Sequence, residues 1–215
     1  MESIMQKFDN DSGVKNMSSS DNDKNNNVTN IAVAVMVGGQ SKRMGRPKES
    51  VIIPWDGRTF LEKICDEIDA AGDIFVEKYI SVRKGQEISH SGYKPVEDIY
   101  DGIGPMGGIA SVLTRAKKDD VSAVLFLACD MIKCDSNEIG RIVSSYKGED
   151  VLFARTKERG IQPLASIYSV NLLDAITAQI AEGDYRLRHI AERLDDIVYY
   201  DALNEELYEN VNSFD

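Results

Sequence analysis

The stretch Ile31-Ala-Val-Ala-Val-Met-Val37, followed directly by Gly-Gly-Gln-Ser-Lys-Arg-Met-Gly-Arg-Pro-Lys48, decides the fold of this chain. Its first part is a short, continuous apolar run, which predicts a buried strand. Its second part holds three glycines, which let backbone amides turn toward an anion, and four cations without an acid. A strand that runs straight into such a loop indicates a phosphate site; a solvated surface turn is the alternative.

The overall charge narrows the choice of ligand. The chain carries a formal net charge of −11, so a local group of cations is not part of a general basic surface. Binding to nucleic acid or to an acidic membrane is therefore not expected. The pattern favours a pocket for one small polyphosphate.

Two better-known phosphate loops do not fit. A Walker A loop requires Gly-Lys-Ser/Thr, whereas Gly45 is followed by Arg46 and Pro47, and Lys48 comes too late. Residues 102–107 match the dinucleotide pattern G-x-G-x-x-G, but they follow the polar stretch 97–101 rather than a long apolar strand. That pattern alone is weak evidence for a dinucleotide.

Length and composition predict one folded domain with a tail. Residues 1–30 are rich in Asn, Asp, Ser and Lys and bury too little apolar surface to fold, so we expect a disordered tail. Met17 leaves a later natural start open. Residues 31–215, in a chain with 42% hydrophobic residues, are enough for one sizeable core.

We expect a cytoplasmic protein. No apolar run is long enough to span a bilayer, and the N-terminus lacks the order of a signal peptide. The three cysteines fit a reducing compartment, and Cys129 and Cys134 have no neighbouring Cys or His to complete a zinc site. They are expected to be core thiols.

Apolar runs alternate with amphipathic segments along the chain. This pattern predicts one α/β domain with a mostly parallel sheet and no internal repeat. The predicted strands are 31–37, 74–82, 121–128, 151–154 and 164–168, and the predicted helices are 59–71, one beginning near Pro105 or Gly107, one capped by Ser136 and reaching Tyr146, and 171–181.

Several polar residues follow predicted strands, where parallel sheets bind ligands. Ser81 and Arg83 lie at the end of one strand, and Asp98 and Asp101 precede the segment that begins with Gly102. Asp130 follows the longest apolar run, a position from which a carboxylate can hold Mg²⁺ that bridges phosphate oxygens. The alternative for each aspartate is a turn or a helix cap.

The two histidines, His90 and His189, offer neither a metal cluster nor support for a Ser-His-Asp site. Polyphosphate transfer needs no histidine, because catalysis there consists largely of positioning and of neutralising negative charge.

Five motifs together resemble the molybdenum cofactor guanylyltransferases of the nucleotidyltransferase superfamily, and they cover residues 31–215. They are Gly38-Gly39-Gln-Ser-Lys-Arg-Met-Gly45 with Lys48, Gly104-Pro-Met-Gly-Gly-Ile109, Cys129-Asp-Met131, Gln162-Pro-Leu-Ala165 and Asn210-Val-Asn212. The resemblance implies a Rossmann-like, three-layer α/β fold of the glycosyltransferase-A type. It also implies transfer of GMP from GTP to molybdenum-loaded molybdopterin, with release of pyrophosphate.

The resemblance also implies roles for individual residues. Met36, Val37, Gly38 and Gly39 would bind the nucleotide at the strand end, and Arg43 and Lys48 would bind the triphosphate. Asp98 would contact GTP, and Asp130 would contact both nucleotide and Mg²⁺. Ser81 stands where relatives often have an asparagine, and Asp130-Met131-Ile132 replaces the usual Asp-Met-Pro.

From these roles we expect Arg43, Lys48 and Asp130 to be catalytic. The ionised terminal phosphate of molybdopterin would attack the α-phosphorus of GTP without a general base. The acceptor phosphate has two candidate contacts, residues 155–159 and residues 186–188, and exposed surface arginines are the alternative for both.

Other functions stay open at this point. One is a sibling enzyme that uses CTP, or a sugar-phosphate nucleotidyltransferase. The other is a non-catalytic adaptor that delivers the cofactor, although a metal carboxylate beside a phosphate lysine speaks against lost catalysis. The resemblance further implies transient contacts with cofactor-synthesis proteins and molybdoenzymes.

Overall fold

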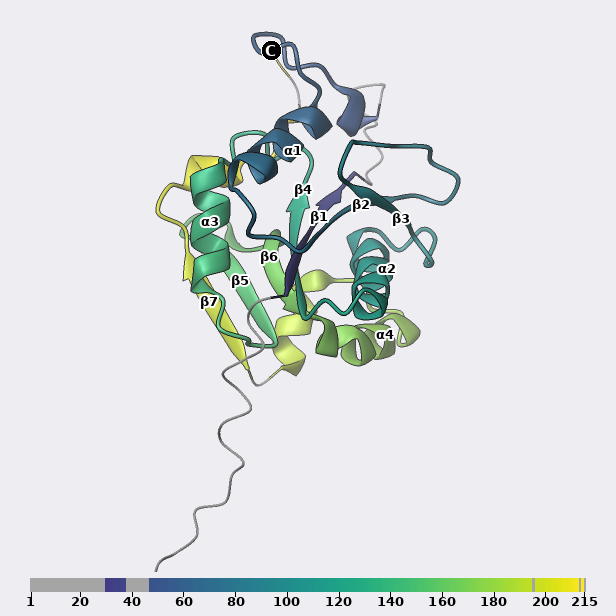
Figure 1. The fold of residues 1–215 in the computed structure, drawn as a ribbon. Helices are drawn as coiled ribbons and strands as arrows, with labels where there is room; N and C mark the ends of the chain where they lie inside the picture. Colours follow the sequence, from purple (N-terminus) through teal and green to yellow (C-terminus); the bar gives the residue numbers. More distant parts are fainter. Residues whose placement is uncertain (1–29, 38–46, 195, 213, 215) are drawn as a thin grey trace, which may run out of the picture.

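The computed structural model describes residues 30–37, 47–194, 196–212 and 214. These residues build a single seven-stranded sheet, in the order β3-β2-β1-β4-β6-β5-β7 (Figure 1). The strands are β1 Ile31–Met36, β2 Glu77–Val82, β3 Lys94–Glu97, β4 Ala123–Ala128, β5 Val151–Thr156, β6 Gly160–Ser169 and β7 Ile197–Asp201.

The sheet is mostly parallel, as the alternation of apolar and amphipathic segments predicts. β1 pairs in parallel with both β2 and β4, β2 with β3, and β5 with β7. Strand β6 runs antiparallel to its neighbours β4 and β5. All six residues of β1 and of β4 are buried, which is the expected property of central strands covered on both faces.

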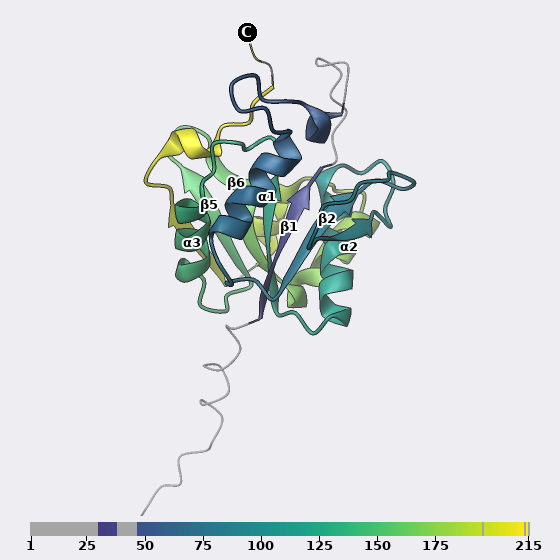
Figure 2. The same ribbon diagram turned by 45° about the horizontal axis from the view of Figure 1, so that its top comes forward.

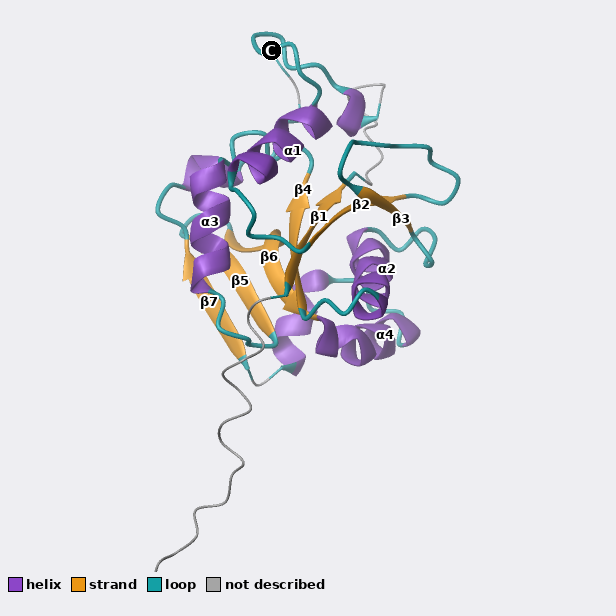
Figure 3. Cartoon of the chain, in the orientation of Figure 1, coloured by secondary structure: helices purple, strands orange, loops and turns teal. Residues whose placement is uncertain are grey.

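Helices cover both faces of this sheet and give three layers (Figures 1 and 3). The helices are α1 Phe60–Ala70, α2 Pro105–Lys118, α3 Ser136–Ser145 and α4 Leu173–Ala181, with 3₁₀ turns at Lys48–Ser50, Val170–Leu172, Leu187–Arg193 and Glu205–Tyr208.

Alternate residues of β1 face the two helical layers. Val33 and Val35 pack in one cluster with apolar residues of α1 and α3, whereas Ala32 and Ala34 pack in a second cluster with residues of α2 and α4. Small alanines on one side let α2 lie close to β1, and this closeness matters at the functional site below. The three-layer α/β fold expected from the sequence is therefore confirmed.

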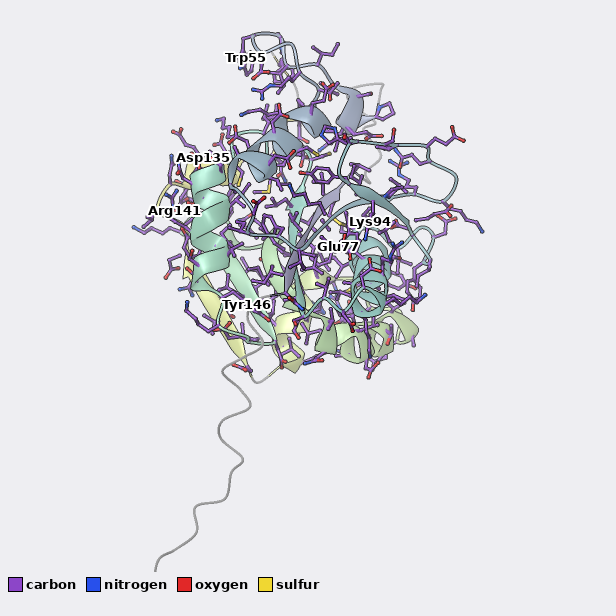
Figure 4. All side chains as sticks on the ribbon, in the orientation of Figure 1. Trp55, Glu77, Lys94, Asp135, Arg141 and Tyr146 are labelled. Carbon is purple, nitrogen blue, oxygen red and sulfur yellow. The ribbon has the colours of Figure 1, made fainter. Side chains whose placement is uncertain are left out.

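The predicted boundaries of α1 agree with the structure within one residue, whereas the predicted N-cap of α3 does not. Thr59 caps α1 in a capping box, in which Glu62 N–H donates to Thr59 Oγ1 at 3.2 Å and Thr59 N–H donates to Glu62 Oε2 at 2.7 Å. The prediction of Ser136 as the cap of α3 is wrong. Asp135, at the start of α3 in Figure 4, has the extended backbone of a cap, and its carboxylate accepts from Glu138 N–H at 2.8 Å.

Two edge strands were not predicted, and several strand boundaries differ from the prediction; β6, for example, begins at Gly160 rather than at Leu164. β2 begins at Glu77 rather than at Ile74. β3 is short, and only Val96 in it is buried, while β7 has no fully buried residue, so neither shows a strong apolar run. A salt bridge between Lys94 Nζ and Glu77 Oε1, at 2.6 Å, joins β3 to β2 (Figure 4).

None of the helices in the described part of the chain combines the length and the apolar composition that a membrane crossing requires. Cys65, Cys129 and Cys134 are free and buried, as expected of core thiols, and burial raises the pKa of Cys65 and of Cys134 to about 12. Of the expected tail, residues 1–30, all but Asn30 lie outside the described residues.

Candidate functional site

The site lies at the carboxyl ends of the parallel strands β1, β2, β3 and β4. Met36 ends β1 and Val37 follows it, both as buried residues, and Lys48 begins the 3₁₀ turn that follows the basic loop. The predicted site residues Gly38, Gly39 and Arg43 lie in the loop 38–46, outside the described residues. The residues on either side of that loop, Val37 and Pro47, are described.

Lys48 meets Asp130 at this edge. Lys48 Nζ forms an ion pair with the carboxylate of Asp130, although the two residues are 82 positions apart. Their side chains are 22% and 9% exposed, so the pair lies in a partly dry environment in which charge interactions are stronger than in water. Sequence reasoning named Lys48 for the triphosphate and Asp130 for the metal ion but did not predict this ion pair, and both roles stay predictions.

Asn212 completes this contact. Lys48 Nζ also donates to Asn212 Oδ1 at 2.9 Å, and Val211 N–H donates to the backbone carbonyl of Asp130 at 3.0 Å. Sequence reasoning named Asn210-Val211-Asn212 as a motif but assigned it no role. The C-terminal segment therefore returns to the site and contacts both members of the ion pair.

A second group of residues surrounds a cavity beside β1. Its volume is about 500 Å³. The residues that line it come from the ends of β1 and β2, from the segment before α2 and from the first turn of α2: Met36, Ser81, Arg83, Lys84, Asp98, Tyr100, Asp101, Gly102, Gly104, Pro105 and Gly108. Ser81 and Arg83, predicted at a strand end, and Asp98 and Asp101, predicted just before the segment that begins with Gly102, thus line a single cavity together with Met36.

Asp98 is held in this cavity by its neighbours. Ser81 Oγ donates to Asp98 Oδ1 at 3.1 Å, and Asp98 N–H donates to the carbonyl of Val82 at 2.8 Å. Burial raises the pKa of Asp98 above its usual range, against the opposing effects of the Ser81 hydrogen bond and of Arg83. A desolvated carboxylate with a fixed orientation is well suited to accept hydrogen bonds from a ligand.

Glycines allow the start of α2 to approach the strands. A Cβ atom on Gly108 would lie 2.5 Å from Met36 Cε and 2.7 Å from Ser81 Oγ, and one on Gly107 would lie 2.7 Å from the carbonyl oxygen of Tyr100. Gly104, which precedes the helix, has φ of 70°, a conformation that favours glycine. The glycines in and next to the segment 102–107 therefore shape the cavity wall. The match of this segment to the dinucleotide pattern was weak evidence for a dinucleotide.

The oxygen atoms of Asp130 and Asn212 that contact Lys48 fit a magnesium ion that would arrive with a nucleotide. Within the described ranges, no group of three or more His, Cys, Asp or Glu side chains could hold a metal ion alone. The Asp130 carboxylate and the Asn212 amide oxygen converge on one cation, Lys48 Nζ. Oxygen ligands from one carboxylate, completed by phosphate oxygens and water, are the usual surroundings of Mg²⁺.

The two candidate contacts for the acceptor phosphate lie side by side. Arg188 Nη2 donates to the carbonyl of Arg159 at 3.3 Å, which brings the segment 186–188 to the turn between β5 and β6. Arg155 forms a salt bridge with Asp201 at 2.7 Å, and Arg186 forms one with Asp184 at 2.8 Å. Both arginines are thus engaged by surface acids, and their part in acceptor binding stays a prediction.

Comparison with known sequences gives a consistent result. The sequence model of the MobA-like NTP transferase domain matches residues 33–197. A probable molybdenum cofactor guanylyltransferase of Bacillus cytotoxicus is 30% identical over 153 residues, which cover 69% of this chain and 73% of the relative. A probable molybdenum cofactor guanylyltransferase of Deinococcus radiodurans is 28% identical over 183 residues, which cover 85% of this chain and 89% of the relative.

Solved structures share the fold. Molybdopterin-guanine dinucleotide biosynthesis protein A of Archaeoglobus fulgidus superposes with a TM-score of 0.67 at 22% identity, and the match covers 85% of this chain and 92% of that one. A 4-diphosphocytidyl-2C-methyl-D-erythritol synthase of Anaerococcus prevotii gives 0.66 at 13% identity, over 86% and 92% of the two chains. From the family match over most of its length, together with this fold, the chain belongs to the MobA-like NTP transferase domain family and is a nucleotidyltransferase.

Proposed function

We propose that this protein transfers GMP from GTP to molybdenum-loaded molybdopterin and releases pyrophosphate. The names of the relatives support this assignment, because several are molybdenum cofactor guanylyltransferases. The observation that carries it in the structure is the Lys48–Asp130 pair, which lies at the carboxyl ends of β1 and β4, close to a cavity for the nucleotide.

The reaction requires little covalent chemistry from the protein. An oxygen of the acceptor's terminal phosphate forms a bond to the α-phosphorus of GTP, while the bond from that phosphorus to the bridging α–β oxygen breaks. The bonding electrons leave with pyrophosphate. Because the acceptor phosphate is already ionised, no side chain needs to remove a proton, and the protein's task is to hold two anions together.

Lys48 supplies positive charge for the triphosphate in this scheme. Asp130 and Asn212 hold its Nζ in place. Arg43, in that loop, would add a second cation. Asp130, with the Asn212 oxygen near it, would hold Mg²⁺, which neutralises charge on phosphate oxygens when it is bound.

Asp98 and Ser81 would hold the nucleoside part. The Asp98 carboxylate accepts from Ser81 through Oδ1, and its side chain lines the cavity together with Met36. Hydrogen-bond donors of guanosine are suitable partners for this carboxylate. Met36, Val37, Gly38 and Gly39 would contact the base and the phosphates from the strand end.

We infer from the resemblance transient contacts with proteins that make molybdopterin and with the apoenzymes that receive the product. We also propose a cytoplasmic location, which is supported by three free, buried cysteines of a kind that suits a reducing compartment.

Isothermal titration of the full chain with GTP, CTP and ATP, with and without Mg²⁺, tests the nucleotide. Selective, Mg²⁺-dependent binding of GTP that weakens in Asp130→Ala supports the proposal. Preference for CTP would instead assign the chain to the sibling activity, and failure to bind any nucleotide would favour the cofactor-delivery adaptor.

A further inference from the structure

The last part of the chain crosses the functional edge of the sheet. We call residues 205–212 the C-terminal strap; in Figures 1 and 2 it belongs to the yellow part of the chain that begins at the upper left, near α3. Glu205 Oε1 accepts from Lys157 N–H at 2.7 Å, and Glu209 pairs with Lys133 at 2.6 Å. At the C-terminal end of the strap, Val211 N–H donates to the carbonyl of Asp130, and Asn212 Oδ1 accepts from the ammonium group of Lys48.

One buried hydrogen bond anchors this strap to α3. Tyr208 Oη donates to Glu138 Oε1 at 2.5 Å, and Arg141 Nη2 pairs with the other carboxylate oxygen at 2.5 Å. The Glu138 side chain is 0% exposed, and Tyr208 is 1% exposed. Arg141, in contrast, extends from α3 toward solvent, where Figure 4 labels it.

Holding the strap against α3 through a fully buried carboxylate costs free energy. An ion in the core loses its hydration, and a well-packed apolar pair of similar size is often as stable. Burial, together with the Glu138 carboxylate, also raises the pKa of Tyr208, so its hydroxyl stays protonated as a donor. What the polar pair adds over an apolar one is direction, because a hydrogen bond fixes the register of the strap and nonspecific packing does not.

Register matters because the segment that follows is otherwise held mainly by apolar packing of Val211 and Phe214 against Val51, Ile53, Phe60 and Ile132, which fixes no register by itself. Residues 209–212 have no helical or strand structure. Only four positions separate Tyr208 from Asn212, so a shift at Tyr208 is passed on to the contacts at Asp130 and Lys48. Surface ion pairs such as Glu209 with Lys133, whose side chains are 38% and 46% exposed, hold position weakly.

We propose that Tyr208 and Glu138 are positioning residues of the nucleotidyl-transfer site. Their hydrogen bond fixes the C-terminal strap at the register in which Val211 and Asn212 hold Asp130 and Lys48. Neither residue contacts the nucleotide in this account. The inference depends on the proposed function only for what Lys48 and Asp130 do in turnover, not for how they are held.

The variant Tyr208→Phe tests this inference, because it removes one hydroxyl and keeps the ring. Tyr168→Phe is the matched control: Tyr168 is also fully buried, and its hydroxyl donates to the carbonyl of Pro163 at 3.0 Å, outside the C-terminal strap. Two readouts need no nucleotide. One is the rate at which an acetylating reagent modifies Lys48, followed by mass spectrometry, and the other is hydrogen exchange at the Val211 amide.

Both rates should rise by about 5-fold or more in Tyr208→Phe and stay at the wild-type value in Tyr168→Phe, because a loosened strap exposes Lys48 and frees the Val211 amide. In the transfer assay, kcat should fall by about 10-fold in Tyr208→Phe, with a smaller change in KM for GTP, as expected for misplaced groups. Wild-type Lys48 acetylation and Val211 exchange in Tyr208→Phe would overturn the inference.

Substitutions of Glu138 separate a directional bond from simple packing. Glu138→Gln keeps an acceptor for the Tyr208 hydroxyl and should retain most of the Lys48 protection, whereas Glu138→Leu should behave like Tyr208→Phe. Wild-type protection of Lys48 in Glu138→Leu would contradict the inference. Because acetylation is measured without nucleotide, a protein that failed to use GTP would remove the proposed function and leave this result standing.

Discussion

Lys48 and Asp130 form an ion pair although 82 residues separate them, because parallel strands β1 and β4 end at the same edge of the sheet. Asn212 accepts a hydrogen bond from the same lysine. A cation, a carboxylate and an amide oxygen thus meet next to the basic loop. We regard this meeting point as the place where the triphosphate and its metal ion are held.

Loss of either member of this pair should impair turnover. Lys48→Ala and Asp130→Ala are each expected to lower kcat by on the order of 100-fold or more, the usual effect of removing one electrostatic stabiliser. Steady-state measurement of pyrophosphate release checks this. Lys78→Ala is a suitable control, because Lys78 lies at the amino end of β2, opposite to the site, and pairs with Asp69 at 2.7 Å. This variant should keep the wild-type kcat. A variant with unimpaired turnover would remove that residue from the mechanism.

A methyl group at Gly108 should close the nucleotide cavity. In Gly108→Ala the new Cβ would clash with Met36 and Ser81, so we expect weaker GTP binding and a loss of about 1–3 kcal/mol in the free energy of unfolding. Gly140→Ala in α3 is the matched control, because a Cβ there meets nothing within 4 Å. That change should stabilise the protein by roughly 0.5–1 kcal/mol in urea unfolding. Equal stability of the two variants would contradict the close approach of α2.

The raised pKa of Asp98 predicts how GTP binding depends on pH. Because burial favours the neutral form, Asp98 takes up its proton at a higher pH than an exposed aspartate. As the pH is lowered, GTP affinity should therefore begin to fall at a pH above 3.8, the ordinary pKa of aspartate. For stability the sign is opposite: the contribution of Asp98 is fully present below 3.8 and is lost as pH rises through the raised pKa.

Asp98→Asn therefore should keep or raise the Tm at pH 7 while it weakens GTP binding and removes this acidic dependence. Calorimetric titration from pH 7 down to the limit of solubility, paired with thermal unfolding, measures both effects. An affinity for GTP that is unchanged in Asp98→Asn would exclude this carboxylate from nucleotide recognition.

The capping box of α1 makes a smaller, structural prediction. Thr59→Ala removes the acceptor for Glu62 N–H and should cost about 1 kcal/mol of stability, measured by urea unfolding. Thr59→Ser keeps an oxygen at the same position and should stay close to the wild type. Since Thr59 lies away from the nucleotide cavity, KM for GTP should not change in either variant.

The central part of this structure could be read from the sequence. An apolar run that passes directly into a glycine-rich basic loop identified β1, and the acid after the longest apolar run identified Asp130. The rule that ligands bind at strand ends then placed Lys48, Ser81 and Asp98 in one region. The predicted strands β1 and β4 are confirmed, because burial leaves a strong local pattern, whereas the roles of these site residues stay predictions.

Other features left no comparable pattern. An apolar strand looks the same in either direction, so the antiparallel orientation of β6 was not visible. Asp135 and Ser136 are both good caps, and only the backbone geometry distinguishes them. The C-terminal strap has neither helical nor strand periodicity, and the bond between Tyr208 and Glu138 joins residues 70 positions apart.

The most direct test of the proposed function follows the label from the nucleotide to the product. The full chain would be incubated with Mg²⁺, molybdenum-loaded molybdopterin and GTP or CTP labelled at the α-phosphate. We predict that label from GTP, and not from CTP, enters a molybdopterin dinucleotide, and that Asp130→Ala slows this transfer by on the order of 100-fold or more. Transfer from CTP alone, or absence of any labelled dinucleotide with the wild-type protein, would contradict the assignment.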